Sequence, residues 1–212
     1  MAEHKIPQVT AKRLPLYFRY MEKLQEDGKQ RVSSKDISEA LHIDSATVRR
    51  DFSYLGELGK KGYGYSVSYL VEFLKEFLRQ DEISNVIIMG VGNFGTALLN
   101  YNFSQNENIT IVAGIDVDAA KVGTTVNGVP IFHLSELNKI CKEHDVQIAI
   151  VTVPAASAQS TVDQLVMAGV NGILNFTPTR LLAPQEVRIH HIDLTVELQT
   201  LIYLLKNNDN IE

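Results

Sequence analysis

The chain has 212 residues and a formal net charge of −5, and 45% of its residues are hydrophobic. This composition can build buried cores and excludes a fibrous or disordered protein. A single cysteine, Cys141, excludes an internal disulfide framework, and neither a long apolar run nor a leader-like start is present, so we expect a cytoplasmic protein without a membrane span.

The charges are unevenly distributed along the chain. Residues 1–80 contain 14 Lys and Arg against 11 Asp and Glu, whereas residues 81–212 contain 6 against 14. A locally basic first part is compatible with nucleic-acid binding by that part alone.

The first eighty residues predict three helices and a glycine-rich loop. The first helix, over 12–26, places five apolar residues at helical spacing: Leu16, Tyr17, Tyr20, Met21 and Leu24. Ser33 and Asp36 have the spacing of a capping box for a short second helix. Asp44 is a suitable N-cap for a third helix, which begins at Ser45. With the glycine, lysine and tyrosine loop at 56–65, this order predicts a winged helix-turn-helix domain over 1–80.

The third helix is the candidate recognition helix. Val48, Phe52 and Leu55 would pack inward, and the polar residues would approach DNA: Ser45, Thr47, Arg49, Arg50, Ser53 and Tyr54. Lys60, Lys61 and Tyr63 on the wing would contact backbone or a flanking minor groove. The sequence does not distinguish arginines that read bases from those that hold phosphates. The alternative is a solvated basic loop on a protein-interaction module.

After an amphipathic helix over 67–79, strands and helices alternate. Strands are predicted at 85–89, 109–115, 146–153 and 172–176, helices at 94–101, 135–142 and 157–168, and a hairpin-like stretch at 122–132. This alternation predicts a Rossmann-like, doubly wound parallel sheet, an α/β domain over 81–190. A last apolar helix, from Asp193 to Lys206, lies in the segment 191–212.

The first of these strands runs into a G-x-G-x-x-G motif, whose residues are Gly90, Val91, Gly92, Asn93, Phe94 and Gly95. Such a turn lets the backbone pass close to a pyrophosphate at a helix N-terminus. The second strand ends at Asp116, where a carboxylate accepts hydrogen bonds from ribose hydroxyls and repels a 2′-phosphate. Asp118 adds negative charge and no arginine is near, so the cofactor is predicted to be NADH or NAD⁺. The alternative for Asp116 is a solvated residue at a strand end.

Two further segments follow the third and fourth main strands, at the edge where open α/β sheets bind ligands. They are Thr152, Val153 and Pro154, and Asn175, Phe176, Thr177 and Pro178. They are candidates for the nicotinamide end of the site, unless the prolines only end the strands.

No catalytic residue or metal site is predicted beside this cofactor site. The chain has no Tyr-x-x-x-Lys pair, and four histidines are expected on surface turns or helix ends: His133, His144, His190 and His191. Cys141 is expected to be a buried, inert thiol. A cofactor site without catalytic groups favours sensing over turnover.

The sequence resembles the Rex family of redox-sensing repressors over nearly its whole length. The resemblance rests on residues 13–17, 48–54 and 62–65 in the first part and on 90–95, 116–118, 153–155 and 172–178 in the second. It implies a homodimer that binds double-stranded operator DNA when NADH is scarce, with a domain-swapped C-terminal helix. By position, Tyr101 would lie near the nicotinamides, and Arg19 would pair with Asp193 in one state. The pair His190-His191 departs from the acidic or polar turn that we expect there.

Two rival interpretations stay open. One is an NAD-dependent oxidoreductase with a fused regulatory head, and the other is a scaffold that binds CoA or another nucleotide. For the switch itself, we expect NADH to be favoured over NAD⁺, because a charged nicotinamide ring is costly to bury against Phe94, Tyr101 and Phe176.

Overall fold

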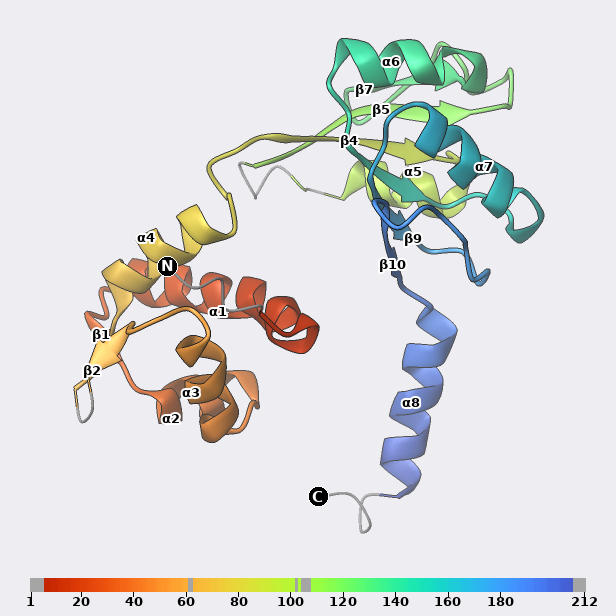
Figure 1. Cartoon of the computed structure of the whole chain (residues 1–212). Helices are drawn as coiled ribbons and strands as arrows, with labels where there is room; N and C mark the ends of the chain where they lie inside the picture. Colours follow the sequence, from red (N-terminus) through yellow and green to blue (C-terminus); the bar gives the residue numbers. More distant parts are fainter. Residues whose placement is uncertain (1–5, 61–62, 102, 104–107, 208–212) are drawn as a thin grey trace. The chain divides into compact units, whose positions relative to one another are not determined.

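The computed structural model describes residues 6–60, 63–101, 103 and 108–207, and of Lys60 only the backbone. It divides into two compact units, Met1–Glu82 and Ile83–Glu212, each of which is described here by itself. The first unit is called the head and the second the body (Figure 1).

The head has the winged helix-turn-helix arrangement that the sequence predicts. Its elements in chain order are α1 (Gln8–Glu26), β1 (Arg31–Val32), α2 (Ser34–Leu41), α3 (Ser45–Ser53), β2 (Gly59–Lys60), β3 (Gly64–Ser66) and α4 (Val67–Phe77). The short strands pair antiparallel in the order β1-β3-β2. Both predicted caps are confirmed: Ser33 and Asp36 form a capping box, and Asp44 accepts from the amides of Ala46 and Thr47.

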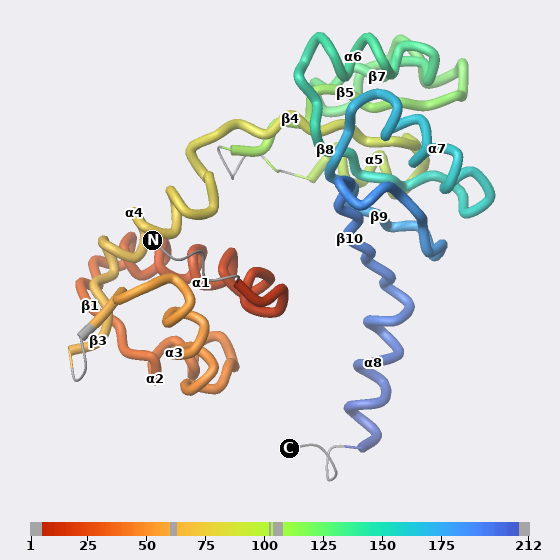
Figure 2. Tube along the Cα trace, in the orientation of Figure 1, coloured from red at the N-terminus to blue at the C-terminus, as the bar shows by residue number. Residues whose placement is uncertain are grey.

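The buried face of α1 differs in part from the predicted one. Tyr17 and Met21 are buried as expected, but Leu16 is 50% exposed, and Leu14 and Phe18 are buried instead. The helix begins earlier than predicted and passes through Pro15, and it packs beside α4 in the head core (Figure 2). The inward residues predicted for α3 also lie in or against this core.

The body is a Rossmann-like domain. Its elements are β4 (Ser84–Met89), α5 (Asn93–Asn100), β5 (Ile109–Asp116), β6 (Thr125–Val126), β7 (Val129–His133), α6 (Leu137–Glu143), β8 (Ile148–Val151), α7 (Ala155–Met167), β9 (Gly172–Asn175), β10 (Arg188–His191) and α8 (Leu194–Lys206). In the described part of the body, the strands form one sheet in the order β10-β9-β8-β4-β5-β7-β6. All neighbours pair parallel except β6 and β7, which form the predicted hairpin.

Alternate residues of β4 face two separate cores, so the sheet is covered on both sides. Ile87 and Met89 belong to the core under α6 and α7, whereas Val86 and Ile88 belong to the core under α5. This is why β4 is a continuous apolar run rather than an alternating one. The strand order places the carboxyl ends of β4, β5 and β8 together, where the chain reverses its direction of winding.

Strand β10 was not predicted from the sequence. The prediction of a surface turn or helix end for His190 and His191 is wrong: both lie on β10, which pairs parallel with β9. Val187 and Ile189 alternate with polar residues only once, which is too short a pattern to indicate a strand, so long-range pairing with β9 defines this edge strand. His144 lies at a helix end as expected, because it is the C-cap of α6, whereas His133 is the last residue of β7 and caps the short 3₁₀-helix that follows. Cys141 is buried, which raises the pKa of its thiol.

Candidate functional site

The glycine motif forms a tight turn between β4 and α5. Gly90 has a φ of +89°, a conformation that favours glycine, and a side chain there would also press on Val153. A Cβ on Gly95 would overlap the carbonyl oxygen of Gly90, so α5 packs against the end of β4 only with glycine at this position. Gly92, by contrast, has no heavy atom within 4 Å of where a Cβ would stand. Its place in the motif is therefore not explained by packing within the protein.

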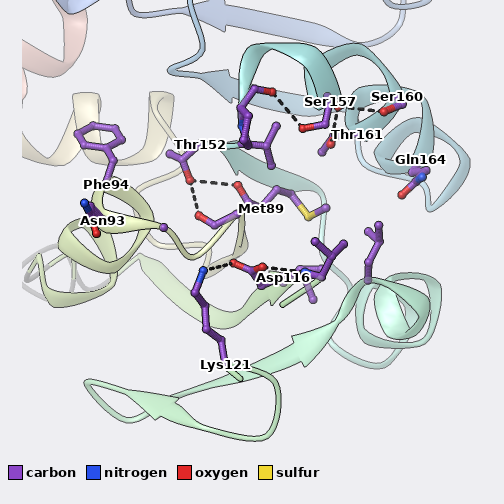
Figure 3. A pocket seen from close by; sticks show the side chains of 17 residues that line it. Met89, Asn93, Phe94, Asp116, Lys121, Thr152, Ser157, Ser160, Thr161 and Gln164 are labelled. Atoms are coloured by element: carbon purple, nitrogen blue, oxygen red, sulfur yellow. Dashed lines mark hydrogen bonds and ion pairs between the residues drawn. The ribbon is translucent and has the colours of Figure 1, made fainter. Parts of the chain in front are cut away.

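Thr152 fixes this turn from the neighbouring strand end. Its Oγ1 lies 2.7 Å from the carbonyl oxygen of Gly90 and 3.0 Å from that of Met89, and the hydroxyl hydrogen is donated to this pair of acceptors (Figure 3). The amide of Thr152 also donates to the carbonyl of Met89. Thr152, a predicted cofactor residue, thus holds the glycine turn in place through hydrogen bonds.

Asp116 ends β5 and is tied to the same turn. Its Oδ2 accepts from the amide of Val91 at 2.7 Å, and its Oδ1 accepts from the amides of Val117 and Asp118 at 2.8 and 2.9 Å. Burial alone would raise the pKa of Asp116, but these amides and Lys121 outweigh it and hold the pKa below its ordinary value. The carboxylate is ionised at neutral pH.

Lys121 was not predicted at this site. Its Nζ lies 3.3 Å from Asp116 Oδ2 (Figure 3). It also lies 3.5 Å from a carboxylate oxygen of Asp118. Desolvation alone would lower the pKa of Lys121, but its contacts with Asp116 and Asp118 together outweigh that effect and raise the pKa. The spacing of Asp118 and Lys121 was visible in the sequence, but the turn that brings the lysine back to β5 was not.

These residues surround a crevice of about 580 Å³ at the carboxyl edge of the sheet. Eight of the predicted cofactor residues line it: Gly90, Gly92, Asn93, Phe94, Asp116, Thr152, Val153 and Pro154. Nine residues that were not predicted complete the lining: Met89 at the end of β4, Ile115 on β5, Val117 and Lys121 after β5, Leu134 directly after β7, and Ser157, Ser160, Thr161 and Gln164 on α7. A mostly apolar crevice with one ionised carboxylate is typical of a small-molecule site.

Other predicted cofactor residues lie outside this lining. Val91 and Gly95 act through backbone contacts with Asp116 and Gly90. Asn175 and Thr177 are buried behind the edge, and Pro178 is exposed beside them. Phe176 reaches the crevice indirectly, because its ring packs edge-on against the Phe94 ring with centroids 5.0 Å apart. Tyr101, just after α5, is 63% exposed and packs against Phe103.

In the head, α3, the candidate recognition helix, is anchored through Asp51. This carboxylate is 1% exposed and accepts two hydrogen bonds from Arg13, at 2.6 and 2.7 Å, one from Tyr17 at 2.6 Å and one from Thr10 at 2.8 Å. Burial would raise the pKa of Asp51, but the hydrogen bonds from Arg13, Tyr17 and Thr10 together lower it. The hydrogen bonds to Asp51 raise the pKa of Arg13, and burial together with the hydrogen bond to Asp51 raises the pKa of Tyr17. Four charge-assisted bonds from α1 therefore set the position of α3.

The surface beside this anchor contains the predicted DNA-binding residues. Arg49, Arg50 and Ser53 are exposed on α3, while Ser45, Thr47 and Tyr54 are half-buried. Arg49 donates to Ser34 Oγ at 3.3 Å, at the start of α2, and both residues border a hollow of about 700 Å³ between α2, α3 and the wing. On the wing, Tyr63 is 71% exposed, and Lys61 lies outside the described residues.

Both parts of the chain are similar to known proteins. A family described as "CoA binding domain" matches residues 81–179, and a family described as "Putative DNA-binding protein N-terminus" matches residues 5–53. The redox-sensing transcriptional repressor Rex of Halalkalibacterium halodurans is 63% identical over 204 residues, covering 96% of each chain. That of Listeria welshimeri is 61% identical over 203 residues, covering 96% of this chain and 94% of its own. The chain belongs to the Rex family.

The fold of this Rex-family chain is also that of solved repressors. The crystal structure of RSP in complex with β-NAD⁺ and operator DNA matches with a TM-score of 0.89 at 30% identity, over 97% of this chain and 94% of that one. RSP in complex with β-NADH matches with a TM-score of 0.84 at 29% identity, over 96% of each chain.

Two residues that the family resemblance singles out lie in different units of this Rex-family chain. Arg19 is exposed on α1, and Asp193 is the N-cap of α8, where it accepts from the amides of Thr195 and Val196. Their pairing stays a prediction. Across the described ranges, no helix has the length and apolar character needed to cross a membrane, and no cluster of three potential metal ligands occurs.

Proposed function

We propose that this chain is a transcriptional repressor that senses the NADH/NAD⁺ ratio. It binds double-stranded operator DNA as a homodimer when NADH is low and releases the DNA when NADH rises. The observation that carries this proposal is the presence, in one Rex-family chain, of an anchored recognition helix and a glycine crevice that ends at Asp116. The crystal structures of RSP with β-NAD⁺ and operator DNA and with β-NADH support it.

The crevice fits a dinucleotide in two respects. Gly92 leaves open space where a side chain would stand. It is also the N-cap of α5 and has no side chain that could bond to the first amides of the helix. These amides therefore suit an anion such as a pyrophosphate. Asp116 is an ionised acceptor at the end of β5, where a ribose diol is bound in Rossmann domains. We assign Thr152–Pro154 to the wall of this cofactor site. We assign the loop 175–178 to the same site, because Phe176 packs against Phe94.

We infer that the crevice binds the cofactor without catalysing a reaction of it. Bound NADH differs from NAD⁺ in the charge of its nicotinamide ring, and Phe94 and Phe176 form an apolar contact at the crevice that favours the neutral ring. The oxidoreductase interpretation requires a proton-transfer group beside the nicotinamide, and a turnover assay tests it. The CoA-binding scaffold keeps one observation in its favour, the family match over residues 81–179.

The last helix supports the dimer. None of the residues of α8 is buried, and seven apolar side chains and one tyrosine on it are exposed by 39–67%: Leu194, Val196, Leu198, Leu201, Ile202, Tyr203, Leu204 and Leu205. An apolar surface of this size on one helix requires a partner, and a swapped helix in a second copy provides it. We accordingly assign residues 1–80 to DNA binding, 81–190 to the cofactor and 191–212 to dimerisation.

A dimer explains how a ligand in the body controls the head. Two recognition helices bind operator half-sites only at the spacing set by the DNA helical repeat. A ligand that prefers one arrangement of the two bodies shifts the population toward it, by as much as its affinity for the two arrangements differs. In the NADH-bound arrangement, the spacing of the two recognition helices no longer matches the spacing of the operator half-sites.

A competition gel shift tests the proposal. The probe is a palindromic DNA that this protein itself selects from a random library, and the competitors are NADH, NAD⁺ and CoA. Release by NADH at a concentration at which NAD⁺ and CoA leave the complex intact supports the proposal. Release by CoA alone would establish the scaffold interpretation, and turnover of nicotinamide with a small metabolite would establish the oxidoreductase.

A further inference from the structure

Asn175 joins the loop beside the crevice to the strand that leads into α8. The residue is fully buried at the end of β9. Its Oδ1 accepts from the amide of Thr177 at 3.0 Å, and its backbone oxygen accepts from the amide of Ile192 at 2.8 Å. Its side-chain nitrogen Nδ2 lies 3.0 Å from the oxygen of Thr179 and 3.0 Å from Nδ1 of His191. One side chain therefore contacts both segments.

The direction of the bond to His191 follows from the geometry. Because Asn175 Oδ1 accepts from a backbone amide, the group that faces His191 is the NH₂ of Asn175, which can only donate. Nδ1 of His191 must then be an unprotonated acceptor, with the ring proton on Nε2. If the His191 ring were protonated on both nitrogens, its Nδ1–H would face an N–H of the Asn175 side chain, and no hydrogen bond could form.

This contact lies between the crevice and the dimerisation helix. On one side, Asn175 fixes the start of the loop that carries Phe176 against Phe94, a residue of the crevice wall. On the other side, His191 is two residues before Asp193, the N-cap of α8. The Thr179 and Thr177 contacts fix the path of the same loop.

We infer that His191 is a positioning residue that links the cofactor-side loop to α8 only while its Nδ1 is unprotonated, so that acidification weakens the NADH response. This inference rests on the proposed function. The titratable or charged residues nearest to His191 along the chain are few: Arg188 and His190 lie on its own strand with side chains on the opposite face, Asp193 is the N-cap of α8, and Arg180 lies in the loop after β9. β9 itself has no titratable side chain, and among the described residues no ion pair involves His191.

The test compares three variants of the full-length protein in the operator-release assay at about pH 8 and about pH 5.5, which span histidine titration. His191→Asn places an amide oxygen where Nδ1 stands and cannot titrate, whereas His191→Phe removes the acceptor. His190→Asn is the matched control, because its side chain is on the opposite face of the strand.

For the wild type, the NADH concentration that releases half of the operator should rise about fivefold on acidification, as expected for one lost hydrogen bond. His190→Asn should keep this rise, His191→Asn should abolish it, and His191→Phe should behave at pH 8 as the wild type does at pH 5.5. A rise that His191→Asn leaves intact would overturn the inference.

Nitrogen NMR of the His191 ring gives a readout that is independent of operator release and of the Phe variant's folding. The inference requires the Nε2–H tautomer at about pH 8, and an Nδ1–H tautomer would overturn it. If NADH releases the operator at neither pH, the proposed function has failed, whereas the tautomer still decides whether the link exists.

Discussion

Substitution of Gly92 by alanine separates the role of the glycine turn in cofactor binding from its role in folding. A Cβ at this position meets no heavy atom within 4 Å, and the backbone φ of −78° suits any residue. The free energy of unfolding should therefore stay within about 0.5 kcal/mol of the wild type. If the second glycine admits the pyrophosphate, the methyl group occupies that approach. NADH affinity should then fall at least tenfold, or about 1.4 kcal/mol.

Gly95→Ala is the matched control within the same motif. Its Cβ would overlap the backbone oxygen of Gly90 and press on Thr152 Oγ1, and backbone cannot move aside as a side chain can. Overpacking of this kind costs about 1–3 kcal/mol, which lowers the melting temperature of a protein of this size by roughly 2–12 °C.

Calorimetric titration with NADH and thermal unfolding without cofactor measure the two effects. We expect Gly92→Ala to lose affinity at unchanged melting temperature and Gly95→Ala to lose stability. NADH binding by Gly92→Ala with wild-type affinity would refute the placement of the pyrophosphate at this turn.

Three further substitutions test other parts of the molecule. Asp116→Ala should weaken NADH binding while cofactor-free operator binding persists, and displacement by NADH at an unchanged concentration would remove Asp116 from the site. Arg50→Ala should weaken operator binding by about 1–3 kcal/mol without changing NADH affinity, and unchanged binding in a gel shift at physiological salt would exclude its contact with DNA. Asp51→Asn should destabilise the head by about 3 kcal/mol, the low end for a broken buried ion pair, because Arg13 is 26% exposed and can rehydrate. The folded-state pKa of Asp51 is lowered, so its carboxylate contributes fully to the free energy of unfolding above the unfolded-state pKa of about 3.9. That contribution is lost as the pH falls through the lower folded-state pKa. In urea titrations from pH 6 to 3, Asp51→Asn should therefore lose less free energy of unfolding than the wild type does.

Features carried by local sequence were predictable. The capping box of Ser33 and Asp36, the Asp44 cap and the glycine turn between β4 and α5 depend on residues a few positions apart, and the structure contains each of them. Asp116 was also found, because a strand end is fixed by the periodicity that precedes it.

Features that depend on distant contacts were not predictable. The role of Asp51 comes from α1, 34 to 41 residues away, and an aspartate between an arginine and a phenylalanine gives no local sign of burial. β10 becomes a strand by pairing with β9, and Lys121 reaches Asp116 only after a turn. In each case the partner, rather than the residue itself, determines the structure.

The most direct test of redox sensing is the release of operator DNA from the full-length protein by NADH and by NAD⁺ in parallel titrations at fixed salt. If the crevice binds the neutral nicotinamide ring of NADH more tightly than the charged ring of NAD⁺, NADH should release the DNA at a concentration at least tenfold lower than NAD⁺ does. Release by both cofactors at the same concentration, or by neither, would contradict the account.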